Sequence, residues 1–154
     1  MNLIITKQLA SYKWARNNTL QILKAAQAAG VMNFTLHPSQ HTALYQFQCL
    51  ATTDDAYYRK LTNNPDKRFG VLLQHNGAVK KADVPEAQLS KLLRQDLKRL
   101  EALLATFTDE QFAIHAQTIQ SIFNHEYLHQ GQLIVVLRQA GVELPERFRK
   151  AFDL

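Results

Sequence analysis

Two histidines, His125 and His129, stand four residues apart in the segment NHEYLH. Four residues are slightly more than one turn of an α-helix, so both imidazoles leave the same side and can reach one metal ion. The same line of the helix continues with the residues Ile122, Gln132, Leu133 and Val136. This mostly apolar line predicts that the histidines face a helical core, where an unpaired polar group costs about 1–3 kcal/mol. A metal ion would satisfy the rings, and so would hydrogen bonds without a metal.

The segment HEYLH also matches the H-E-x-x-H pattern of zinc peptidases, in which Glu126 would act as general base on a water molecule. The extended form of that pattern has Gly three residues after the second histidine and another His three residues later. This chain has Gln132 and Val135 at those positions. A peptidase therefore ranks below another kind of metal site.

Hydrophobic periodicity predicts four amphipathic helices, at about residues 6–29, 38–62, 83–107 and 118–141. The second helix is predicted to begin near Pro38 with His37 at its cap, and the third with Asp83 at its cap. Residues 64–83 are predicted to be non-helical, and Asn76-Gly77 indicates a small hairpin there. Arg16 interrupts the apolar stripe of the first helix.

Four such helices predict an all-α four-helix bundle formed as one domain over residues 1–154. The connection between the second and third helices is about 20 residues long, which exceeds the usual length of a hairpin connection. A connection of this length can carry the chain back along the bundle. The sequence therefore predicts that these two helices run parallel, in up-down-down-up order.

The composition sets the broad class of the protein. The chain has 154 residues, of which 46% are hydrophobic and 20% charged, as expected for one globular domain. No apolar run approaches the roughly 18–20 residues that a membrane span needs, and we see no signal peptide. The single cysteine, Cys49, excludes an intramolecular disulfide, so we expect a cytoplasmic protein.

The net charge of +5 raises the question of nucleic-acid binding. Four basic residues of the predicted third helix lie near one face, but acidic residues interrupt them and no aromatic residues lie among them; they are Lys91, Arg94, Lys98 and Arg99. A solvated helix face explains this pattern, so nucleic-acid binding ranks last.

Three segments together resemble the DinB-like (DinB/YfiT) superfamily. NHEYLHQGQLIVVLRQAGVELP is similar to the last helix of that superfamily, whose members carry an N-H-x-x-x-H-R-G-Q run, an apolar stretch and G-x-x-x-P. SYKWARNNTL resembles the opening helix, and LYQFQCLATTDDAYYRKL the second helix. The resemblance covers most of the chain and implies a four-helix bundle.

The resemblance also implies a divalent metal, often zinc or nickel, held by one histidine of the second helix and two of the fourth. His125 and His129 match the latter pair. The usual histidine of the second helix falls on Cys49, or on Gln46 if the segment is counted from Ser39. A cysteine thiolate is a good zinc ligand, so a Cys-His-His site is expected. Gln130 replaces the usual arginine before Gly131.

The resemblance favours a metal-dependent enzyme acting on a small molecule, either a transferase that uses a low-molecular-weight thiol or a hydrolase. Glu126 would then assist the metal ligands or accept a proton; the alternative, from its offset from the histidine stripe, is a charge that faces solvent. The alternative, supported by the missing third histidine, is a metal-free bundle that acts as a binding or interaction module. A homodimer formed through a helical face is a further expectation.

Overall fold

The computed structural model describes residues 3–38, 40–64 and 84–152, and this part of the chain is helical without any strand. No helix in it is long and apolar enough to span a membrane. The helices are α1 (Leu3–Ala28), α2 (Ala43–Thr62), a short 3₁₀ helix η1 (Glu86–Gln88), α3 (Leu89–Ala105), α4 (Asp109–Gln139) and α5 (Glu146–Phe152).

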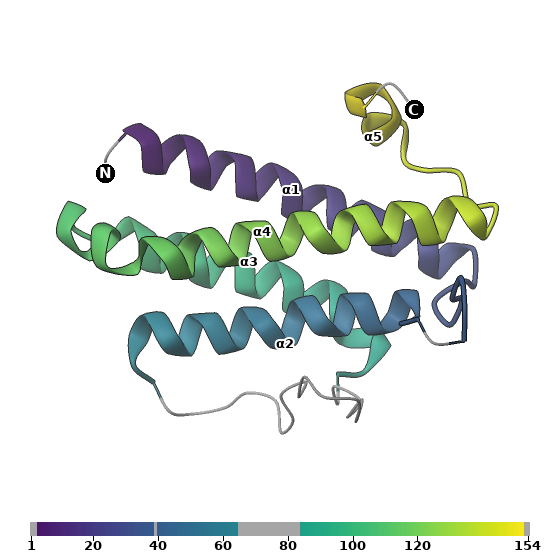
Figure 1. The fold of residues 1–154 in the computed structure, drawn as a ribbon, viewed down its shortest axis with the longest axis horizontal. Helices are drawn as coiled ribbons and strands as arrows, with labels where there is room; N and C mark the ends of the chain where they lie inside the picture. The colour runs from purple at the N-terminus through teal and green to yellow at the C-terminus, as the bar shows by residue number, and fades with distance from the viewer. Residues whose placement is uncertain (1–2, 39, 65–83, 153–154) are drawn as a thin grey trace.

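The four long helices form a bundle with the predicted up-down-down-up order (Figure 1). Helices α2 and α3 run in the same direction, and α1 and α4 run in the opposite one. Each of α1 and α2 packs against both α3 and α4. Because α2 is antiparallel to α4, the first half of α2 lies beside the second half of α4.

The core of the bundle has two apolar parts. One contains buried residues from the α1 end, α2 start, α3 start and α4 end, among them Leu23, Phe47, Leu93 and Leu137. The other contains residues from the opposite end of the bundle, among them Tyr12, Leu61, Leu100, Phe112 and Phe123. The chain positions between these two sets carry buried polar side chains, so a polar layer crosses the middle of the bundle.

The starts of α2 and α3 differ from the predictions. Helix α2 begins at Ala43 instead of near Pro38, because the Thr42 side chain accepts a hydrogen bond from the Tyr45 backbone N–H and caps the helix there. The 3₁₀ helix η1 leads directly into α3, and Pro85 precedes η1. The predicted Asp83 cap and the Asn76-Gly77 hairpin lie outside the described residues.

Helix α4 begins nine residues before the predicted start at Thr118, at Asp109. The Thr108 hydroxyl accepts a hydrogen bond from the Gln111 backbone N–H, and the Gln111 side chain accepts one from the Thr108 N–H. This reciprocal pair is a capping box, which satisfies two backbone donors at once. The short helix α5 was not predicted; its Phe148 is buried in the first apolar part.

Thr108→Ala should lower the free energy of unfolding by about 1 kcal/mol, because it removes the acceptor that caps the longest helix. Urea unfolding followed by far-ultraviolet circular dichroism measures this change. Thr62→Ala is the matched control, since the Thr62 hydroxyl bonds to carbonyls of its own helix. A change in Thr108→Ala no larger than that in Thr62→Ala would contradict the assigned capping role.

Candidate metal centre

Three potential metal ligands from two helices meet in the polar layer. The Cys49 Sγ atom of α2 lies 3.6 Å from His125 Nε2, and His125 Nε2 lies 3.0 Å from His129 Nε2. All three ligand atoms lie within 4.8 Å of one another. The structure therefore brings together the cysteine and both histidines that the sequence predicted.

Two of the three separations are close to those expected around a tetrahedral metal ion. Zinc lies about 2.0–2.1 Å from histidine nitrogen and about 2.3 Å from cysteine sulfur. Tetrahedral angles then place two nitrogens about 3.3 Å apart and a sulfur about 3.6 Å from a nitrogen. The S–N distance of 3.6 Å agrees with this geometry, and the N–N distance of 3.0 Å requires a shift of a few tenths of an ångström, as expected of flexible side chains.

Gln46, the alternative ligand, occupies a different place. Its Oε1 atom contacts His129 Nδ1, whereas His129 Nε2 faces His125. With the Gln46 oxygen as acceptor, His129 carries its proton on Nδ1 and presents the Nε2 lone pair toward Cys49 and His125. A partner of this kind fixes the ring and its tautomer in many metal sites. The structure thus places Gln46 behind a ligand instead of among the ligands.

Burial makes all three ligand groups neutral in the absence of a cation. Burial, together with the neighbouring His125, lowers the pKa of His129 to about 3, and burial also lowers the pKa of His125. Burial also raises the pKa of the Cys49 thiol, while a hydrogen bond from Thr53 opposes this. The histidines therefore need lose no proton to bind a metal at neutral pH. The thiol must lose one, which a bound divalent cation would favour.

The ligands adjoin a buried ionic network centred on Arg16 of α1, whose side chain is fully buried. Its guanidinium donates to Glu126 Oε2 of α4 at 2.5 and 3.0 Å and to Asp54 Oδ2 of α2 at 2.6 Å. It also donates to the Leu93 carbonyl of α3 at 3.3 Å and to the Tyr12 hydroxyl at 2.8 Å. One side chain thus contacts all four long helices.

Glu126 belongs to this network. Its Oε2 atom accepts from Arg16, and its Oε1 atom accepts from the Thr19 hydroxyl. Burial raises the pKa of Glu126, and the Arg16 guanidinium opposes that shift. Both carboxylate oxygens are therefore engaged inside the bundle, and the carboxylate supports the helix that carries the two histidines.

Gln130 bonds to α1. Its amide nitrogen donates to the Ala15 carbonyl and, at 2.9 Å, to the Thr19 hydroxyl, which in turn donates to Glu126. Gln130, which stands where the DinB-like pattern has arginine, is thus buried in the contact between α4 and α1.

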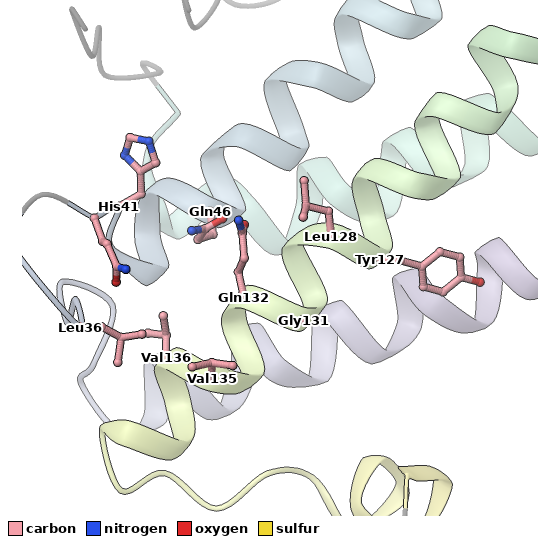
Figure 2. Close-up of a pocket in the computed structure, with 10 residues that line it drawn as sticks. Leu36, His41, Gln46, Tyr127, Leu128, Gly131, Gln132, Val135 and Val136 are labelled. Carbon is pink, nitrogen blue, oxygen red and sulfur yellow. The ribbon is translucent and has the colours of Figure 1, made fainter.

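A pocket of about 690 Å³ borders the metal-site cluster (Figure 2). It lies along α4 from Tyr127 to Val136 and reaches the start of α2 and the segment before it. Gln46 and Gln132 line it, and Gln46 hydrogen-bonds to His129. Side chains of the pocket can therefore place a bound molecule beside the cluster.

The partners of Arg16 were not predicted from the sequence. Arg16 itself indicates a buried ion pair, because a cation on an apolar stripe must be paired if it is buried. The partners could not be chosen, since many carboxylates lie on the other helices. Of the predicted basic face, Arg99 instead contacts Asp55 and Asp96 and stacks on Tyr58. Among the remaining histidines, His41 lines the pocket, and His75 lies outside the described residues.

Arg16→Met should lower the free energy of unfolding by about 3–5 kcal/mol, because two buried carboxylates lose their counter-ion. Chemical denaturation measures the loss. It should be smaller near pH 5 than near pH 8, since a Glu126 carboxyl whose pKa is already raised takes up a proton at the lower pH.

The triple variant Arg16→Met/Asp54→Asn/Glu126→Gln is the matched control, because it removes all three charges together. It should recover part of the stability lost by Arg16→Met. An Arg16→Met protein as stable as the wild type would show that the ionic network does not hold the bundle.

Comparison with known proteins identifies the fold. No family model matches the chain, and no curated protein matches it in sequence. The crystal structure of a DinB-like protein from Bacillus cereus ATCC 10987 superposes with a TM-score of 0.65 and 20% sequence identity, covering 90% of this chain and 93% of that one. This agrees with the resemblance found in the sequence. The chain therefore has the DinB-like fold.

Proposed function

We propose that this protein is a divalent-metal-dependent enzyme whose metal ion is held by Cys49, His125 and His129. The observation that carries the proposal is the convergence of these three ligand atoms, from two neighbouring antiparallel helices, within 4.8 Å. Three protein ligands leave a further position for water or substrate, as in catalytic zinc sites. The donor set, one thiol and two imidazoles, suits zinc or nickel.

The surrounding charge supports a cation at this place. Arg16, Asp54 and Glu126 carry a formal charge of −1 together when ionised. Burial raises the pKa of Cys49, and the negative charge of Asp54 adds to this increase. Burial lowers the pKa of His125, where Asp54 opposes the lowering and Arg16 adds to it. The negative charge of Asp54 therefore acts at the cluster, where it also favours a bound cation.

A divalent ion at the cluster would act as a Lewis acid that lowers the pKa of a bound water or thiol. The protein's own residues provide the remaining functions. Gln46 orients His129, and the pocket gives a small molecule access to one side of the cluster. We propose either transfer of a low-molecular-weight thiol to a small-molecule electrophile or hydrolysis of a small molecule.

The geometry favours this function over the H-E-x-x-H peptidase. A peptidase of that kind needs the glutamate free to take a proton from water. In this protein Arg16 and Thr19 engage the two Glu126 oxygens inside the bundle. The nearest further ligand is Cys49, which lies before the motif in the chain and on another helix.

Wild-type protein purified without chelators should contain about one zinc or nickel ion per chain. Cys49→Ala, His125→Ala and His129→Ala should each lose the ion, because two remaining ligands bind weakly. His115→Ala is the matched control, since His115 is on the same helix and packs against Phe107. Elemental analysis by mass spectrometry provides the measurement.

Retention of the ion in Cys49→Ala would exclude Cys49 as a ligand. Absence of the ion from the wild type, even after reconstitution, would contradict the enzyme proposal. The metal-free binding module would then be the better interpretation. Cys49→His provides a positive control, because it restores the three-histidine set that the resemblance implies and should retain the ion.

Gln46→Leu should weaken zinc binding about 10- to 100-fold, because His129 loses the acceptor that orients its ring. Competition with a chromophoric chelator measures the affinity. Gln48→Leu is the control: Gln48 is also buried on α2, but its amide donates to the Val84 carbonyl. A loss of all bound zinc in Gln46→Leu, equal to that in Cys49→Ala, would instead make Gln46 a ligand.

A further inference from the structure

Exposed apolar side chains gather on one part of the described surface. Five large hydrophobic residues are exposed among the described residues, and four of them line the pocket beside the metal-site cluster: Leu36, Tyr127, Leu128 and Val135. Apolar groups concentrated in this way mark binding sites, because dispersed exposure is the rule on other surfaces. The pocket volume of about 690 Å³ lies in the range of small-molecule sites.

The described lining of this pocket contains no lysine, arginine, aspartate or glutamate, although the chain has 18 basic and 13 acidic residues. Its one imidazole belongs to His41, which stacks on Tyr45. Basic side chains instead line pockets on the α1 and α3 side, among them Lys24, Lys91 and Arg94. A charged ligand placed against Leu128, Val135 and Val136 would lose hydration without gaining a counter-ion. The lining therefore selects against charged ligands.

Two of the polar side chains of the pocket, Gln46 and Gln132, lie at the end that borders the cluster, whereas Gln40 and His41 lie toward the start of α2. The Gln46 and Gln132 side chains point toward each other between α2 and α4 (Figure 2). An amide offers two N–H donors and one oxygen acceptor. The Gln46 oxygen faces His129, so its N–H groups remain to donate to a ligand. Carbonyl and amide groups are neutral partners for such donors.

We infer that this pocket binds an uncharged, mainly apolar small molecule with one carbonyl or amide headgroup placed against Gln46 and Gln132. The apolar body of the ligand lies along Leu36, Leu128 and Val135. That this molecule is the substrate rests on the proposed function, because the headgroup lies beside His129. Binding itself requires only the pocket.

The test compares two probes that share one carbon skeleton, 4-phenylbutanamide and 4-phenylbutanoate. Methyl NMR titration of the wild type, near neutral pH, should show that the amide binds about tenfold or more tightly than the carboxylate, because only the carboxylate buries a charge. Shifted methyl signals should belong to Leu36, Leu128, Val135 and Val136. Equal affinities, a preference for the carboxylate, or shifts confined to other residues would overturn the inference.

Leu128→Arg should weaken binding of the amide and strengthen binding of the carboxylate, since it adds a cation to an apolar wall. Ile114→Arg is the matched control, because Ile114 is 69% exposed on the same helix and does not line the pocket. Sedimentation of both variants tests whether a second copy covers the pocket. A wild-type dimer that Leu128→Arg dissociates and Ile114→Arg leaves intact would overturn the small-molecule assignment.

Titration of Cys49→Ala separates this inference from the proposed function. If the wild type binds no metal, and the amide binds equally to the wild type and to Cys49→Ala, the pocket inference is supported and the enzyme proposal fails. Stoichiometric metal without amide binding would overturn the inference and leave the enzyme proposal intact.

Discussion

The buried Arg16 side chain is the constraint on which the rest of the structure depends. An unpaired guanidinium inside a bundle would cost several kcal/mol, so the fold must bring carboxylates to it. Asp54 of α2 and Glu126 of α4 meet this need, and the Leu93 carbonyl of α3 and the Tyr12 hydroxyl take further N–H groups. Apolar packing at either end tolerates small slips between helices, but charge pairs in the centre do not.

The same ion pairs set the register of the metal-site cluster. Glu126 follows His125 directly in α4, and Asp54 lies five residues after Cys49 in α2. When Arg16 holds both carboxylates, α2 and α4 are fixed at a height that places Cys49 Sγ 3.6 Å from His125 Nε2. The ionic network thus fixes the positions of the helices, as a hydrogen bond to a metal-binding histidine fixes the orientation of its ring. A site built on such a support has little freedom to close or open by sliding of helices.

Local sequence patterns predicted the elements better than the contacts between them. The histidine pair, the apolar stripes and the parallel α2 and α3 follow from spacing and from one long connection. The start of α4 was missed because the apolar pattern weakens over residues 109–117, whereas the signal lies in Thr108 and Gln111. The start of α2 was misplaced because Pro38 suits a first turn as well as a loop, and Thr42 provides the cap.

The site could be predicted only in part, for a physical reason. Two ligands on one helix are fixed by helical geometry, but a ligand on another helix depends on register, which single-helix patterns do not contain. Gln46 and Cys49 differ by three residues and lie on nearly the same face of α2, so spacing could not decide between them. The packing of α2 on α4 places Cys49 toward His125 and Gln46 toward His129 Nδ1.

The two residues at which this chain departs from the DinB-like pattern, Cys49 and Gln130, both make the local charge more negative. Cysteine in place of histidine adds a negative charge when the thiol ionises, and glutamine in place of arginine at position 130 removes a positive charge. Arg16, Asp54 and Glu126 sum to −1, and a Cys49 thiolate brings these four groups to −2. A divalent cation would bring the set to neutrality, whereas a neutral third ligand would leave the set with a net charge of +1. Because uncompensated charge is costly inside a protein, this chain's own charges suit a Cys-His-His set.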